Sequence, residues 1–383
     1  MRKTINHIYL IILLALLSSV APIATDTYIP SIPDMADFFN VNIEKVELTL
    51  SIFLIGFAIG QIFGGPISDR IGRRKSSIIG LLGFAFFSFV MIFSTDVYHL
   101  WIFRFIEAFF GGLVIVNANA VLRDKFQGKE AAKVLSLMGT IGGLAPLLAP
   151  AIGAFIIHFF SWKAVFLFLT IYSLVIAFLI FKDLEESYTY VKQSIYESYK
   201  TVLSNKTAMK AMLTLALSFS GFFIFITKSS FILIDYYNVS TDHFPFFFGV
   251  NFILLIGMVR VNLWLLKKYE ALTLAKVGII IQIILGIIWI LTANTDNIAI
   301  TMILMAGYMS MLAFVLGNCM ALALEHFKKN AGLASGVIGV LQFGLGSIVS
   351  SIVLLFNSTT LLPIGIAITI IPIISYFIIR TYK

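Results

Sequence analysis

The sequence predicts an all-α membrane protein with twelve transmembrane helices. Of its 383 residues, 60% are apolar and 12% are charged, and the mean hydropathy is +0.99. Soluble domains are about half apolar and about a quarter charged, so this composition is typical of a chain that crosses a membrane many times. The apolar stretches are continuous, whereas the strands of a membrane barrel alternate in pattern over about ten residues.

Each apolar stretch is long enough to cross the hydrocarbon, which takes about 20 helical residues. The expected spans are 8–28, 48–68, 76–95, 98–122, 134–157, 164–181, 211–234, 243–266, 277–295, 298–324, 331–355 and 361–379. No charged residue separates the last two. The turn residues Asn357 to Thr360 divide them, because one helix of the combined length would overshoot a bilayer.

The basic residues fall in alternate connections and at the two termini. The chain has 27 Lys and Arg against 19 Asp and Glu, a net charge of +8. The opposite set of connections carries only Lys45 and Lys163. This is the positive-inside pattern, so we expect both termini and the basic connections to be cytoplasmic. The charge therefore indicates orientation in a membrane and does not indicate a nucleic-acid partner.

The longest polar segment divides the spans into two sets of six. We expect an N-terminal six-helix bundle over residues 1–182, a cytoplasmic linker over 183–209 and a C-terminal six-helix bundle over 210–383. Two such halves around a site near the middle of the membrane are one known plan of membrane transporters.

A short, crowded and charged segment, Gly65–Lys75, joins the second and third spans. Glycine allows a tight reversal of the chain. Asp69 can accept hydrogen bonds from free helix N–H groups or pair with a cation, and the arginines can bridge to carboxylates or helix ends on a neighbouring helix. As a gating loop we single out Gly65, Asp69, Arg70, Gly72, Arg73 and Arg74.

The spacing of glycine, acid and arginine in this segment resembles the signature loop of the major facilitator superfamily. Other segments are similar to the Bcr/CflA multidrug efflux transporters of that superfamily, and the likeness covers nearly the whole chain. These segments are Asp26–Pro33, Leu122–Asp124 with Glu130–Lys133, Leu144–Gly153, Ser161–Phe166, Asn318–Glu325 and Gly336–Gly346. The resemblance implies the major facilitator fold.

Asp26 is the only acidic residue in the first expected span. A carboxylate in hydrocarbon is costly, so it normally faces a cavity or a partner and indicates a functional site. We interpret Asp26 as a group that binds a transported proton. The alternative is a hydrated residue near the periplasmic mouth.

Arg104 and Glu107 lie three residues apart in the fourth span and therefore share a helix face. One interpretation is a structural ion pair. The resemblance favours a functional one, because Arg104 matches the arginine that the family associates with proton transfer. Glutamine is usual in the family where Glu107 stands, so Glu107 adds a second titratable group to the proton-coupling set.

Lys228 interrupts the seventh span. It can hold an anionic substrate group, pair with Asp26 or Asp235, or extend to the membrane interface. Arg260 in the eighth span is expected to extend to the interface. The substrate-cavity candidates are Tyr28, Asn117, Asn119, Lys228 and Asn318.

The fifth span is rich in glycine and proline, and it resembles the antiporter motif of the family. Its motif residues are Gly142, Pro146, Pro150 and Gly153. Small residues let helices approach closely and proline bends the backbone, so ordinary helix packing is the alternative interpretation.

The resemblance implies a proton-coupled antiporter that exports small amphipathic compounds or drugs across the bacterial inner membrane. It would act as a monomer on a small-molecule substrate and protons, with no cofactor. The five His residues do not cluster and no phosphate-binding loop is present, so we expect no metal site, no ATP-driven pump and no enzyme. One alternative is a dedicated exporter of a metabolite or siderophore, with Lys228 serving an anionic group. Another is a non-transporting receptor or enzyme on the same fold.

Overall fold

The computed structural model describes residues 7–126, 134, 145, 147–186, 195–327, 331–356 and 360–382. Over these residues the chain forms helices and no strand. Eleven helical stretches of the described residues, some of them made of consecutive helices, are long and apolar enough to cross a membrane, and a shorter apolar helix covers Leu147–Phe159. The all-helical membrane fold predicted from hydropathy is therefore confirmed.

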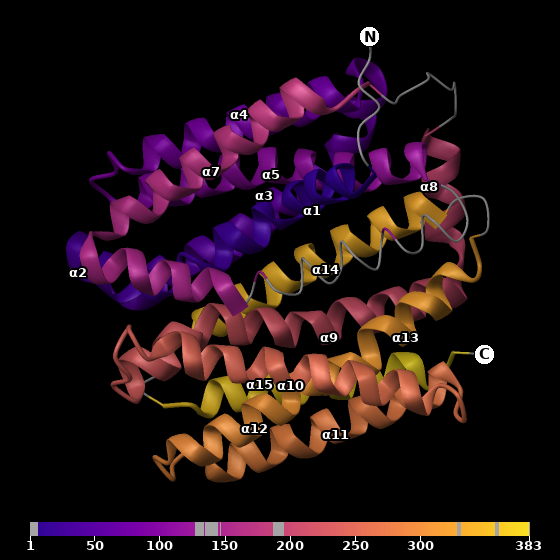
Figure 1. The fold of residues 1–383 in the computed structure, drawn as a ribbon. Coiled ribbons are helices and arrows are strands. Elements are labelled where there is room, and N and C mark those ends of the chain that lie inside the picture. The colour runs from indigo at the N-terminus through magenta and orange to yellow at the C-terminus, as the bar shows by residue number, and fades with distance from the viewer. Residues whose placement is uncertain are drawn as a thin grey trace. The chain divides into compact units, whose positions relative to one another are not determined.

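The chain divides into two compact units, Met1–Lys192 and Gln193–Lys383. The division falls inside the linker expected at 183–209. The first unit, indigo to magenta in Figure 1, contains α1 (His7–Asp26), a 3-10 turn (Ile29–Ser31), α2 (Ile32–Phe39), α3 (Ile43–Ile71), α4 (Arg73–Met91), α5 (Val97–Lys125), the helix Leu147–Phe159 and α7 (Trp162–Asp183).

The second unit begins with a short helix, α8 (Ile195–Ser204), inside the segment expected as the linker. Its other helices are α9 (Lys206–Ser230), a π-helix (Phe231–Tyr236), α10 (Phe244–Leu265), α11 (Ala271–Thr292), α12 (Ile298–Ser310), α13 (Leu312–Leu324), α14 (Ala331–Leu354) and α15 (Leu362–Ile379). The tenth expected span is thus two helices, α12 and α13, which meet at Met311.

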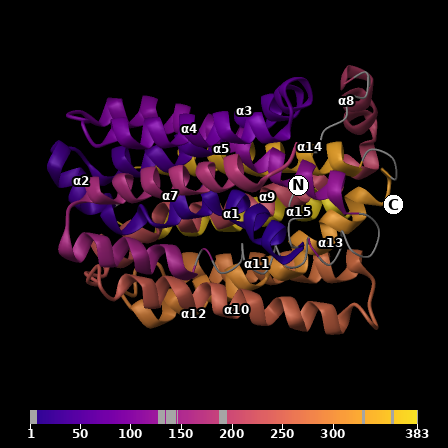
Figure 2. The same ribbon diagram turned by 45° about the horizontal axis from the view of Figure 1, so that its top comes forward.

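In the first unit α5 packs closely against α3, and α3, α4 and α5 run alongside one another in Figures 1 and 2. Glycine makes this approach possible. A methyl group at Gly60 would overlap the carbonyl of Phe109, and one at Gly112 would overlap the carbonyl of Phe57. Helices in lipid associate through such close backbone contacts.

Proline explains why α1 ends at Asp26 and is followed by a 3-10 turn. In a continuous helix the N–H of residue 30 would donate to the carbonyl of Asp26, but Pro30 has no N–H group. The chain continues through the 3-10 turn into α2 and reaches Phe39. The helical segment is therefore longer than the expected span 8–28, and Asp26 lies within it.

Candidate functional site

The interruption after α1 places a carboxylate inside the first unit. Asp26 is 2% exposed. Its Oδ1 accepts a hydrogen bond from the Thr25 hydroxyl at 2.9 Å. A buried carboxylate at an irregular point of a membrane helix is typical of groups that bind ions or protons.

Arg104 of α5 contacts the same end of α1. Its Nη2 donates to the carbonyl of Ala24 at 3.1 Å. Carbonyls in the last turn of a helix lack intrahelical donors and lie at the negative end of the helix dipole, so a guanidinium is favourable there. Arg104 is 0% exposed. It therefore joins α5 to the α1 turn that carries Asp26.

Aromatic rings surround the guanidinium of Arg104. Its central carbon lies 4.5 Å from the ring centre of Tyr28, 4.7 Å from that of Phe53 and 5.8 Å from that of Phe166. A desolvated cation over aromatic faces gains about 2 kcal/mol or more. These rings offset part of the cost of keeping the charge away from water.

Glu107 completes an ion pair with Arg104, as their spacing predicts. Its Oε2 accepts from Arg104 Nη1 at 2.8 Å, and both side chains are 0% exposed. Its Oε1 accepts from the hydroxyl of Ser88 on α4 at 2.5 Å. Glu107 is therefore held by donors from two helices.

Sequence reasoning missed several members of this cluster. The Tyr28 hydroxyl bonds the hydroxyl of Thr49 on α3 at 2.8 Å. Glu47, also on α3, is 0% exposed. The second span is expected to begin at 48, which puts Glu47 outside it, whereas α3 begins at Ile43.

The helix Leu147–Phe159 reaches the residue after Asp26. A methyl group at Gly153 would overlap the carbonyl of Thr27, so the two backbones are in direct contact. Pro150 is buried in the same helix. Gly142 and Pro146 lie outside the described residues. Gly153 thus connects the antiporter-like segment to the helix interruption at Asp26.

The junction of α3 and α4 consists of a single residue, Gly72, with φ +94°. Arg73 organises the contacts around it. Its Nη1 donates to Asp69 Oδ1 at 2.6 Å and to the Ser68 hydroxyl at 2.8 Å, and its Nε donates to Asp124 Oδ2 at 3.2 Å. Asp69 therefore pairs with a cation, which is one of its two expected roles.

The other expected role of Asp69, accepting helix N–H groups, belongs to Glu186. Its carboxylate accepts from the backbone N–H of Arg73 at 2.7 Å and from that of Arg74 at 3.2 Å. It thereby satisfies two free donors at the start of α4, where the helix dipole favours negative charge. Arg74 also donates through Nη2 to the carbonyl of Phe181.

The remaining members of the expected gating loop lie apart from these contacts. The expectation that Gly65 helps to reverse the chain is wrong, because it lies inside α3 and a methyl group there would meet nothing within 4 Å. Arg70 is exposed. Only Gly72 requires glycine, since a side chain would be strained at its φ and would overlap Glu186.

The substrate-cavity candidates occupy different environments. The amide of Asn117 donates to the Ser76 hydroxyl on α4 at 3.0 Å, whereas Asn119 is exposed. In the second unit Asn318 donates to Asn262 Oδ1 at 3.0 Å, and Asn262 donates back at 3.4 Å. The structure therefore places Asn117 and Asn318 in contacts between helices.

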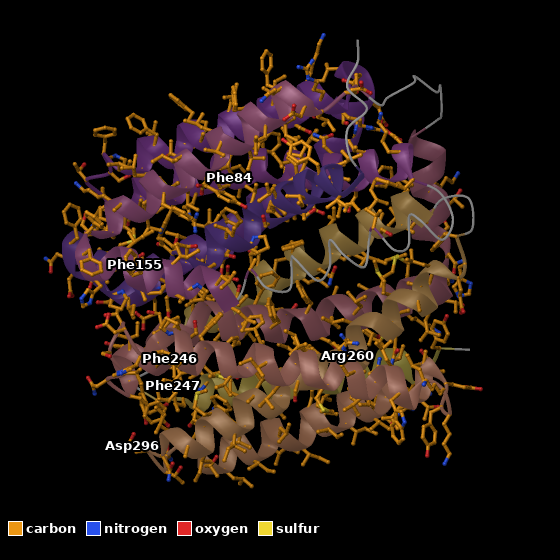
Figure 3. The ribbon with its side chains drawn as sticks, in the orientation of Figure 1. Phe84, Phe155, Phe246, Phe247, Arg260 and Asp296 are labelled. Atoms are coloured by element: carbon orange, nitrogen blue, oxygen red, sulfur yellow. The ribbon has the colours of Figure 1, made fainter. Side chains whose placement is uncertain are left out.

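The two basic residues inside expected spans of the second unit differ in exposure. Lys228 is 1% exposed. The interface alternative requires its side chain to extend to the surface, and it does not. Asp235, one expected partner, is exposed. Arg260 is exposed, and Figure 3 shows it on α10 away from the end that carries Phe246. Within the part of the chain that the structure describes, no group of three or more His, Cys, Asp or Glu residues could hold a metal ion.

Comparison with known proteins identifies relatives along nearly the whole chain. The family model described as Major Facilitator Superfamily matches residues 14–351. The "Bicyclomycin resistance protein homolog" of Haemophilus influenzae is 31% identical over 392 residues, covering 97% of this chain and 96% of that protein. The "Chloramphenicol resistance protein CraA" of Acinetobacter baumannii is 27% identical over 282 residues, covering 70% of this chain and 67% of that protein.

A solved structure supports the fold independently. The crystal structure of a D-xylose-proton symporter superposes with a TM-score of 0.78 and covers 98% of both chains. The two sequences are 18% identical, so this likeness concerns the fold alone.

Proposed function

Because the chain belongs to the major facilitator superfamily, and is a multi-pass membrane transporter rather than an enzyme, we propose that it is a proton-coupled antiporter. It exports small amphipathic compounds, including drugs, from the bacterial cytoplasm in exchange for protons. It works as a monomer in the inner membrane, with both termini in the cytoplasm, and the proton gradient drives it without a cofactor.

The observation that carries this proposal is the burial of Asp26 at the interruption of α1. A carboxylate there can take up and release a proton, and its charge changes when it does. Arg104 hydrogen-bonds the carbonyl of Ala24, two residues earlier on the same turn. A change of charge at Asp26 therefore acts on the turn that Arg104 binds, and through Arg104 on Glu107.

Coupling requires that the proton and the substrate favour different conformations of the protein. Arg104 has several partners from α1, α3 and α7, so its position depends on how these helices pack. In the proposed cycle, protonation of Asp26 weakens the attraction between the α1 turn and the guanidinium. The helices then repack more easily.

The proposed substrate class rests on the relatives. Two of them carry names that refer to resistance to bicyclomycin and to chloramphenicol. Both are bacterial proteins, which supports a bacterial inner membrane. The excess of basic residues in alternate connections supports the proposed orientation.

Replacing Asp26 with Asn tests the proton-binding role. The amide keeps the size of the side chain and cannot exchange a proton, so we expect the variant to fold and insert but to lose uphill transport by at least about tenfold. The measurement is accumulation of chloramphenicol in proteoliposomes under an imposed pH gradient.

Asp34→Asn is the matched control, because Asp34 is an exposed acid of α2. It should transport as the wild type does. Undiminished uphill transport by Asp26→Asn would show that another group carries the proton. Transport by the wild type that is indifferent to the pH gradient would exclude antiport itself.

A further inference from the structure

Four consecutive polar residues are buried in the apolar helix α9. Thr227 and Lys228 are each 1% exposed, and Ser229 and Ser230 are 0% exposed. Among the described residues of the second unit, Lys228 is the only charged residue in the buried class. A charged side chain inside a membrane helix is costly, and it normally marks a path or site for a polar ligand.

The helix changes its geometry directly after this polar run. The π-helix Phe231–Tyr236 follows Ser230, and the N–H of Tyr237 donates to the carbonyl of Ile232 at 3.2 Å. π-Helices are rare and occur frequently at functional sites. The polar run therefore lies at an irregular point of its helix, as Asp26 does in the first unit.

Two hydroxyl groups beside Lys228 remain available for a ligand. The hydroxyl oxygens of Thr227 and Ser230 are buried and have no hydrogen-bond partner within the described structure. Ser229 differs, because its hydroxyl donates to the carbonyl of Ile226 at 2.8 Å. Leaving a buried polar group without a partner costs about 1–3 kcal/mol, so such groups call for an explanation.

The aromatic surroundings suit an amphipathic molecule. The ammonium of Lys228 lies 4.9 Å from the ring centre of Phe231. One turn earlier, Phe225 stacks on Phe248 of α10 with ring centres 5.0 Å apart. Apolar and aromatic walls with a few convergent polar groups are typical of small-molecule sites.

We propose that Thr227, Lys228 and Ser230 form a subsite for an anionic group, such as a carboxylate, on the transported compound. This inference rests on the proposed export of amphipathic compounds and deepens it, since it adds amphipathic anions to the substrates. In the low dielectric of this site an ammonium attracts an anion strongly. The two hydroxyls supply hydrogen bonds to the anion's oxygens, which are stronger than bonds to a neutral group.

Two fluorescent probes of nearly equal size but different charge test the subsite: dansylglycine, a carboxylate, and dansylglycinamide, its neutral amide. Binding is measured by dansyl fluorescence with the purified full-length protein in detergent. The wild type should bind the carboxylate at least tenfold more tightly than the amide. Lys228→Met should remove this preference and change amide binding less than twofold, whereas Lys228→Arg should retain it.

Two further variants make the result specific. Arg260→Met removes an exposed positive charge from the same unit and should leave the preference unchanged. The double variant Thr227→Val with Ser230→Ala keeps the lysine and should weaken carboxylate binding severalfold. It decides the question if Lys228→Met does not fold.

Equal binding of the two probes by the wild type overturns the subsite. So does an equal loss of both probes in a folded Lys228→Met variant, which would make Lys228 structural, or an unchanged preference in that variant. The assay needs no pH gradient. A charge preference that depends on Lys228, in a protein without proton-driven transport, would therefore support the subsite while refuting antiport.

Discussion

Glu107 shows how two neighbours define what a buried carboxylate can do. One oxygen accepts from Arg104 and the other from Ser88. Removing one member of a buried ion pair costs more than the pair itself contributes, because the remaining charge stays buried. The role of Glu107 is therefore tied to the needs of Arg104 as well as to any proton that it binds.

We predict that Glu107→Gln lowers the free energy of unfolding by about 3–5 kcal/mol, because the amide leaves the buried Arg104 without its counter-charge. If Glu107 also takes part in proton exchange, the pH profile of transport changes. The measurements are thermal unfolding in detergent and transport rate against pH for cationic and neutral compounds.

Glu44→Gln serves as the control for Glu107, because it changes a partly exposed acid of α3. Superimposable pH profiles of wild type and Glu107→Gln would make Glu107 a structural partner of Arg104. An unchanged unfolding temperature would argue against the ion pair as a stabilising contact.

At the scale of elements, the start of α4 depends on a residue far away in the chain. Glu186 follows α7, and its carboxylate binds the first N–H groups of α4. Lys125 at the end of α5 pairs with Glu185 at 3.6 Å. The segment after α7 thereby joins the ends of three helices.

We predict that Glu186→Gln lowers the free energy of unfolding by about 1 kcal/mol, through loss of a charge at the positive end of the α4 dipole.

Gly72→Ala should lower the free energy of unfolding by about 1–3 kcal/mol, because alanine is strained at this φ and overlaps Glu186. Since the two residues touch, the combined loss should be smaller than the sum, as a double-mutant cycle of thermal or chemical unfolding would measure. Strictly additive losses of stability would show that the two substitutions act independently, and would contradict this prediction.

The C-terminal segment is attached to the second unit in a similar way. The Tyr382 hydroxyl lies 2.9 Å from the Leu322 carbonyl and 2.8 Å from Glu325 Oε1. Burial, followed by the hydrogen bond and the negative charge of Glu325, raises the pKa of Tyr382 above its ordinary value. The neutral phenol is the form that donates, so its contribution is complete below the ordinary pKa of about 10. It is lost only as the pH rises through the raised pKa.

We predict that Tyr382→Phe lowers the free energy of unfolding by about 1 kcal/mol. The difference from wild type should be the same at pH 8 and pH 9, because both values lie below the titration of the phenol. Thermal unfolding of the two proteins at both pH values measures this. A difference that disappears by pH 9 would show that Tyr382 ionises there.

Local sequence signals predicted some elements and missed others for physical reasons. The pairing of Arg104 with Glu107 follows from helical spacing alone. The second span was expected to begin near residue 48 because Glu44 and Lys45 suggest a connection, whereas α3 already includes them and buries Glu47. The cap by Glu186 joins residues more than a hundred positions apart, and no local pattern encodes such a contact.

For the whole molecule, hydropathy was sufficient to predict a helical membrane protein with many spans. A bilayer demands long apolar helices, so the number of spans and their approximate limits follow from composition. Which side chains face inward depends on how the helices pack, and packing contacts such as Gly153 against Thr27 become visible only in three dimensions. This is why the long membrane-spanning helices were predictable while Thr49, Ser88 and Glu186 were missed.

The proposed orientation predicts a labelling pattern. Cys319 is buried and is the only cysteine, so Cys319→Ser gives a background for single cysteines. We expect Asn294→Cys, in the α11–α12 turn, to react in intact cells with a membrane-impermeant maleimide. Lys268→Cys, in the α10–α11 turn, should react only after the membrane is permeabilised. Both residues are exposed, so the reverse pattern would mean that the chain is inserted the other way.

The single-residue junction at Gly72 also provides a fixed reference distance within the molecule. Consecutive Cα atoms are about 3.8 Å apart, so one residue between two helices keeps the end of α3 close to the start of α4. Spin labels at the exposed residues Ile71 on α3 and Lys75 on α4 should therefore report one narrow distance distribution whatever substrate or pH is applied. Against this fixed reference, any broadening between other labelled pairs can be assigned to the working motion of the transporter.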